Sequence, residues 1–300
     1  MLYFGYLITF VSWSIWLYFL LKVKSQKNGF NNFLILSSFL VGFYSISFGI
    51  FGIQISFYKI LPAFIVFIYL IGSKFRMPKS ILYIFIYFIL VSIISYIIAI
   101  ATGQFEEIIS LGRNPKAAYL YPLVQSILFL SSIFQIWCIS RNSKIEHLKI
   151  LAYFSYGTLV LVLIGYLQII CLRYGLPWFK YWFLSDATGR TVNDLVSLAG
   201  DRGIFRMSSL GGEPRHFASI LSLSIVNILY LRSIKINLNL ISGKYGLVSI
   251  LILFSGIFAS LSASGLLALI IGIAVYILFK DKFKFFIFIL FVTSFSLFLQ

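Results

Sequence analysis

The stretch "SILYIFIYFILVSIISYIIAIA", Ser80 to Ala101, contains 22 residues and no charged side chain. A helix that crosses the hydrocarbon core of a bilayer needs about 20 consecutive apolar residues. Similar runs recur along the 300-residue chain, of which 61% is hydrophobic and only 11% charged, whereas a soluble domain carries about 25% charged residues. The sequence therefore predicts an all-α, polytopic transmembrane helix bundle. The continuous runs differ from the alternating ten-residue segments of a β-barrel.

We predict ten spans within a single integral-membrane domain that covers residues 1–300. They are Tyr3–Leu21, Phe30–Ile50, Ile53–Ile71, Ser80–Ala101, Leu120–Ile139, Ile150–Leu172, Phe217–Leu231, Leu247–Leu261, Gly265–Phe279 and Phe283–Leu299. The second and third spans meet at "SFGIFGIQIS", Ser47 to Ser56, where glycines and the near absence of a polar loop predict a tight turn. Because the chain ends inside an apolar run, we expect a natural continuation beyond Gln300.

The orientation of the spans is predicted from five short connections that carry three basic residues each, fifteen of the chain's 24. These residues are Lys22, Lys24 and Lys27; Lys74, Arg76 and Lys79; Arg141, Lys144 and Lys149; Arg232, Lys235 and Lys244; and Lys280, Lys282 and Lys284. With ten spans they occupy alternate connections, so the positive-inside rule places them in the cytoplasm and the N-terminus outside. The formal charge of +16 is spread along the chain rather than gathered in one stripe, which argues against a nucleic acid partner.

A large external loop is predicted from Arg173 to His216, before the seventh span. Its basic residues are Arg173, Lys180, Arg190, Arg202, Arg206 and Arg215, and its acidic residues are Asp186, Asp194, Asp201 and Glu213. The positive-inside rule disfavours so many arginines on the outer side, so we expect them to serve another purpose. Cys138 and Cys171 fall near opposite faces of the predicted membrane, so we expect no disulfide between them. Their spacing is not that of a metal site.

The end of this loop, "LGGEPRHFAS", Leu210 to Ser219, concentrates ionisable groups in a chain that is otherwise apolar. Its two glycines permit a sharp bend, and Pro214 suits the first position of a helix because it has no N–H to leave unpaired. Glu213 then falls at the helix cap, and Arg215 and His216 fall in the first turn. A helix start with unpaired N–H groups and a positive dipole end favours anions.

Together with Arg202 and Arg206, this helix start predicts a site for a polyanion such as a pyrophosphate, with Glu213 or His216 as a base or proton carrier. Simpler interpretations remain open for each residue. Glu213 can cap its helix and pair with an arginine, His216 can be a packed or capping histidine, and the arginines can contact lipid phosphates. The density of charged groups where a helix enters the membrane favours the functional interpretation.

The pattern Arg206-x4-Gly211-x-Glu213-Pro214, followed by an apolar helix, resembles the Wzy-type O-antigen polymerases and related oligosaccharide repeat-unit polymerases. A second stretch, "FASLSASGLLALIIG" from Phe258 to Gly272, resembles the serine-rich turn of the wider group that includes the O-antigen ligases. There the family has an arginine after the serine, whereas Gly265 follows Ser264 in this chain.

The resemblance implies a membrane glycosyltransferase at the outer face of the bacterial plasma membrane, which polymerises undecaprenyl-pyrophosphate-linked repeat units into O-antigen, capsule or exopolysaccharide. It implies lipid-linked glycans, membrane lipids, a flippase and chain-length regulator proteins as partners. No Asp-x-Asp motif is present, so we expect no metal or cofactor, with arginines taking a metal's place. The implied catalytic residues are Glu213, His216 and Arg206, and the implied pyrophosphate-binding residues are Arg206, Arg215, Arg202 and Arg190.

Two other functions remain open. An O-antigen ligase would use the same donor with a different acceptor. A transporter or flippase of the lipid-linked glycan would place charged groups within the spans, near the middle of the membrane. The predicted apolar spans carry essentially none, which favours an enzyme that acts at the outer face.

Overall fold

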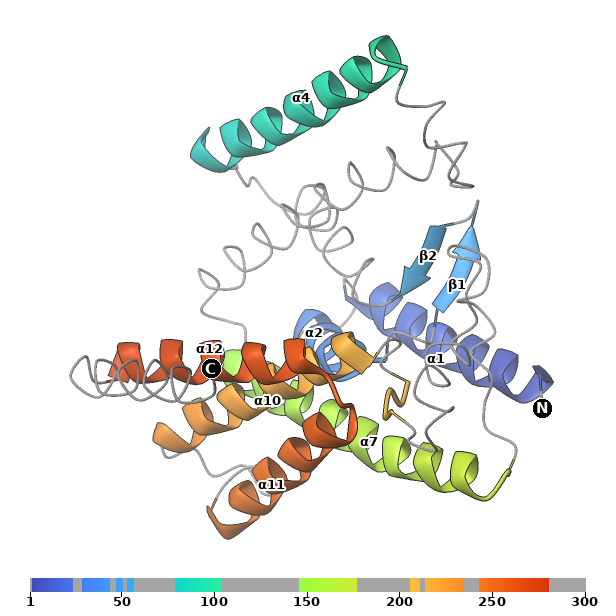
Figure 1. The fold of residues 1–300 in the computed structure, drawn as a ribbon, viewed down its shortest axis with the longest axis vertical. Helices are drawn as coiled ribbons and strands as arrows, with labels where there is room; N and C mark the ends of the chain where they lie inside the picture. The colour runs from blue at the N-terminus through green and yellow to red at the C-terminus, as the bar shows by residue number, and fades with distance from the viewer. Residues whose placement is uncertain are drawn as a thin grey trace, which may run out of the picture. The chain divides into compact units, whose positions relative to one another are not determined.

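The computed structural model describes residues 2–23, 29–43, 47–50, 53–56, 79–103, 146–176, 206–210, 214–234 and 243–280 (Figure 1). They belong to two compact units. The first unit comprises Met1–Phe57 and Glu146–Gln300, and the second comprises Tyr58–Ile145. The described helix of the second unit is α4, Lys79–Ala101, which contains the predicted fourth span.

In the first unit, the described helices are α1 (Leu2–Lys22), α2 (Gly29–Leu40), α7 (His147–Arg173), α10 (Pro214–Ser233), α11 (Gly243–Ala259) and α12 (Ala263–Lys280). Three of them, α7, α10 and α12, are long and apolar enough to cross a membrane. This supports the prediction of a helical membrane protein. The predicted spans Leu120–Ile139 and Phe283–Leu299 lie outside the described residues, and the total of ten stays a prediction.

A short β-hairpin corrects the second and third predicted spans. Helix α2 ends at Leu40, after 12 residues. The chain then forms the antiparallel strands β1 (Ser47–Ile50) and β2 (Ile53–Ser56), with Ile50 opposite Ile53. The reversal lies where the sequence predicted a tight turn, but the flanking residues are strands rather than helix. The physical reason is local: apolar and polar residues alternate in "IQIS", and glycines disfavour a helix on either side.

Helices α7 and α10 run antiparallel and are joined by buried polar side chains. The Thr158 hydroxyl of α7 donates to Ser224 Oγ of α10 over 2.6 Å. The Asn227 amide of α10 donates to the Leu151 carbonyl oxygen, 2.6 Å away, and to Ser155 Oγ, 2.9 Å away. Such bonds between helices satisfy polar groups that would otherwise lie in hydrocarbon.

Small residues bring two further helix pairs into close contact. A methyl group at Gly157 of α7 would lie 2.2 Å from the carbonyl oxygen of Phe39 in α2. A methyl group at Gly265 of α12 would lie 2.2 Å from the β-carbon of Ala218 in α10. About two helical turns further along α12, Gly272 approaches Val226 of α10. Because both residue numbers rise together, α12 runs parallel to α10. Close backbone approach through small residues is typical of helix packing in membranes.

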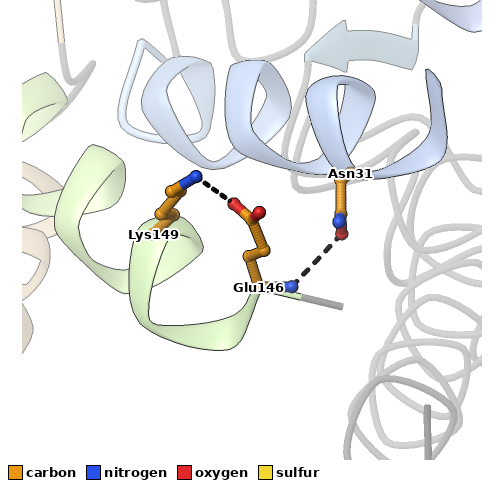
Figure 2. Close-up of polar contacts among 3 residues, drawn as sticks. All are labelled: Asn31, Glu146 and Lys149. Carbon is orange, nitrogen blue, oxygen red and sulfur yellow. Dashed lines mark hydrogen bonds and ion pairs between the residues drawn. The ribbon is translucent and has the colours of Figure 1, made fainter. Parts of the chain in front are cut away.

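The basic helix ends gather at one end of this bundle. The backbone N–H of Glu146 donates to Asn31 Oδ1 over 3.3 Å, which places the starts of α2 and α7 side by side (Figure 2). Glu146 also pairs with Lys149, with 2.6 Å between Oε2 and Nζ (Figure 2). Since α10 and α12 both run opposite to α7, their last turns, with Arg232 and Lys280, lie toward this same end.

The opposite end of the bundle contains the end of α7, the starts of α10 and α12, and the end of α11. This is the arrangement that alternating basic connections predict for these helices. The assignment of the basic end to the cytoplasm rests on the positive-inside rule and stays a prediction.

Candidate functional site

The segment Arg206–Leu210 precedes α10, and its three central residues are buried in the bundle while Arg206 and Leu210 are half-buried. The sequence places it in the external loop Arg173–His216, yet Met207, Ser208 and Ser209 have no exposed surface. Residues 177–205 of that predicted loop lie outside the described residues. Within the predicted loop, Met207–Ser209 are therefore buried protein.

Gln168 of α7 supplies the hydrogen bonds that this irregular segment needs. Its Oε1 accepts the backbone N–H of Ser208 over 3.1 Å and that of Ser209 over 2.7 Å. Its Nε2 donates to Ser208 Oγ, 3.1 Å away. Gln168 is itself fully buried. Buried backbone N–H groups need hydrogen-bond partners, and this one amide satisfies two consecutive N–H groups.

The next contacts fix the segment against two helices. Ser209 adopts a left-handed backbone conformation, with φ of 52°, and its hydroxyl donates to the Leu161 carbonyl oxygen of α7 over 2.6 Å. Met207 packs against Gly165, where an added methyl group would lie 2.6 Å from its sulfur. The Met207 N–H donates to the carbonyl oxygen of Ala259, the last residue of α11, over 2.9 Å.

Arg206 donates to the turn that follows α11. Its Nε lies 3.1 Å from the Ser260 carbonyl oxygen, and its Nη2 lies 3.2 Å from the Leu261 carbonyl oxygen. These carbonyls belong to the negative end of the helix dipole, so a cation is favoured there. The guanidinium has five N–H donors, and these two bonds use two of them. Arg206, which the sequence predicts to bind pyrophosphate, thus uses one edge of its guanidinium to bond to the protein.

The start of α10 agrees with the sequence. The helix begins at Pro214, which is buried, and Arg215 and His216 follow as exposed residues of its first turn. The predicted position of the proline is confirmed. Gly211–Glu213 lie outside the described residues, as do Arg190 and Arg202. The roles predicted for Glu213, as cap or as base, both stay predictions.

The start of α12 lies beside the start of α10. The Ser222 hydroxyl of α10 donates to the Gly265 carbonyl oxygen over 2.8 Å, and Gly265 touches Ala218. Ser262 caps α12, because its Oγ accepts the Gly265 N–H over 3.4 Å. Two parallel helices therefore present their N–H ends at the same end of the bundle. Together with Arg206 and Arg215, this arrangement favours negative charge.

The structure thus brings Arg206, Arg215 and His216 to one end of the bundle, near the turn between α11 and α12. Sequence reasoning missed Gln168 and the carbonyls of Ser260 and Leu261. A signal for Gln168 exists, since it is the one amide side chain in the predicted span Ile150–Leu172, and a buried amide requires partners. Within the described ranges, no group of three or more His, Cys, Asp or Glu side chains could hold a metal ion.

Comparisons with protein-family models, with curated proteins and with solved structures give no match. A functional assignment therefore rests on the residues of this chain, on their placement at the end of the bundle, and on the sequence pattern around Glu213.

Proposed function

We propose that this protein is a membrane glycosyltransferase that polymerises undecaprenyl-pyrophosphate-linked oligosaccharide repeat units at the outer face of the bacterial plasma membrane. The observation that carries the proposal is the bonding of Arg206 to the turn that leads into α12, at the end of the bundle where α10 and α12 begin and opposite the basic helix ends. The charged group of a phosphorylated lipid lies in the headgroup region, which the end of a transmembrane bundle adjoins.

In the proposed reaction, a hydroxyl of the acceptor repeat unit attacks the anomeric carbon of the growing glycan. The bond between that carbon and the pyrophosphate oxygen breaks, and the lipid pyrophosphate leaves with the electron pair. Arg206 and Arg215 stabilise the charge that develops on the leaving group, as the helix N-termini do. Arg190 and Arg202 are further candidates for this role. Glu213 accepts the hydroxyl proton, with His216 as the second candidate.

The distribution of charge favours an enzyme over a transporter. The polar contacts described inside the bundle, at Thr158, Ser224 and Asn227, use uncharged side chains that bond to one another or to backbone. Transporters place ion-binding and substrate-binding groups near the middle of the membrane. In α7 and α10, the charged residues lie in the first and last turns.

The test is an assay with purified protein and lipid-linked repeat units. A ladder of glycan lengths supports a polymerase. Transfer of glycan to a different acceptor supports the ligase alternative, and passage of intact lipid-linked glycan across a vesicle bilayer supports a transporter. Either of the last two results, without a ladder, would overturn the proposal.

Glu213→Gln separates catalysis from capping at the predicted helix start. As a base, Glu213 is needed for the chemical step, so polymer made per folded molecule should fall about 10²–10⁴-fold, the range typical of a general base. As a cap, its replacement costs about 1 kcal/mol of stability and leaves each folded molecule active. The measurement is glycan chain length normalised to protein recovered from the membrane. Near-normal polymer per molecule would remove Glu213 from the mechanism.

A further inference from the structure

The segment Arg206–Leu210 is held from two sides. On one side, Gln168 of α7 accepts the N–H groups of Ser208 and Ser209 and donates to the Ser208 hydroxyl. On the other side, Met207 and Arg206 donate to the last residues of α11 and the turn after it. The position of the Arg206 guanidinium therefore depends on the backbone that follows it, which α7 fixes at Ser208, two residues further along.

We propose that Gln168 is a positioning residue that sets the location of Arg206, and through it the binding of the lipid pyrophosphate. This inference rests on the proposed function for the role of Arg206. Gln168 does not touch the substrate; it acts through the backbone of Ser208 and Ser209. A small displacement of a charged ligand-binding group costs affinity, because the group no longer meets the anion in its preferred geometry.

The alternative is that Gln168 only stabilises the bundle, as Asn227 does at the other end of α7. Both are buried amides that bond to partners on another part of the chain. They differ in what they hold. Asn227 joins two regular helices, whereas Gln168 holds the irregular segment that carries Arg206. A structural amide affects the amount of folded protein, and a positioning amide also affects binding by each folded molecule.

Three variants separate these roles. Gln168→Met keeps the size of the side chain and removes its hydrogen bonds. Gln168→Glu keeps an oxygen that accepts both N–H groups, and the Ser208 hydroxyl can rotate to donate to the second oxygen. Asn227→Leu is the matched control, since it removes a buried amide from the same helix pair without touching the Arg206 segment. Gln168→Asn, which withdraws the amide by one methylene, replaces Gln168→Met where that variant does not fold.

The experiment uses the full-length protein in detergent. Its two measurements are hydrogen exchange of the peptide that covers residues 207–210 and the affinity for undecaprenyl pyrophosphate. In Gln168→Met we expect faster exchange at Ser208 and Ser209 and an affinity about tenfold weaker, by analogy with the lower end of the loss seen when a hydrogen-bond partner that orients a metal ligand is removed. Gln168→Glu should recover most of both properties. Asn227→Leu should match the wild type in both, even where its thermal stability falls.

Several results would overturn the inference. One is a wild-type affinity in Gln168→Met or Gln168→Asn. Another is an exchange rate in those variants that equals the wild-type rate. A third is an equal loss of affinity in Asn227→Leu. A wild-type protein that does not bind the lipid pyrophosphate would instead overturn the proposed function, and the inference with it. The wild-type and variant measurements therefore distinguish the two failures.

Discussion

The two halves of α7 contact α10 and its preceding segment in different ways. In the first half, Ser155 and Thr158 bond to side chains of a regular helix, and Gly157 lies against the backbone of α2. In the second half, Gln168 and the Leu161 carbonyl bond to an irregular segment, and Gly165 lies against a flexible methionine. The first half is helix packing, and the second half holds an irregular segment in place. This difference is why the proposed site is placed at the end of the bundle where the irregular segment lies.

The comparison predicts that the two ends face opposite sides of the membrane. Ser264, near the start of α12, and Ser233, at the end of α10, are both exposed. Each is replaced by cysteine after Cys138 and Cys171 have been changed to serine. In intact cells, a membrane-impermeant thiol reagent should label Ser264→Cys and leave Ser233→Cys unlabelled until the cells are permeabilised. The reverse pattern would move the candidate site to the cytoplasm, and equal labelling would contradict the opposite placement of the ends.

The next largest effect concerns Arg206. Arg206→Lys keeps the positive charge. A lysine ammonium, however, cannot bond to the turn after α11 and at the same time bind an anion through two parallel hydrogen bonds, as a guanidinium can. We expect polymer per folded molecule to fall about 10²–10³-fold, as after loss of one group that stabilises developing negative charge. Arg232→Lys, at the other end of α10, is the control and should retain polymer. If Arg206→Lys lowers only the yield of folded protein, Arg206 is a helix cap without a catalytic role.

The smallest effect compares Gly157→Ala with Gly165→Ala. The new methyl group at position 157 meets a backbone carbonyl oxygen at 2.2 Å, whereas at position 165 it meets the sulfur of Met207 at 2.6 Å. A backbone cannot yield easily, so Gly157→Ala should destabilise the protein by about 1–3 kcal/mol, and Gly165→Ala by less. Gly165→Ala should instead reduce polymer per molecule, because Met207 adjoins Arg206. Thermal unfolding and the polymer assay measure the two effects, and an equal loss of stability would contradict the comparison.

Much of the helical architecture could be predicted from the sequence, because apolar runs of membrane length have few alternatives. The start of α10 at Pro214 followed from local chemistry in the same way. The hairpin near Ile50 could not be predicted from total hydrophobicity, which does not distinguish a strand from part of a helix.

The candidate site was harder to predict than the fold. Arg206, Arg215 and His216 stood out because charged residues are rare in this chain. The bonds that hold Arg206 did not, because they end on backbone carbonyls, which every residue has. Gln168 could have been singled out as an isolated amide, but its partners lie 40 and 41 residues further along the chain. Only the packing of α7 against the segment before α10 reveals what it does.

The length of α7 links the site to the thickness of the membrane. Between its charged ends, the apolar stretch Ile150–Leu172 extends about 35 Å, whereas the hydrocarbon core is about 30 Å thick. Tilting is one way in which an apolar stretch longer than the core fits the bilayer, and the tilt increases in a thinner bilayer. Arg206 is held by α7 through Gln168 and by the end of the shorter α11, so tilting α7 shears these two supports past each other. We therefore expect the thickness of the host membrane to affect the position of this arginine.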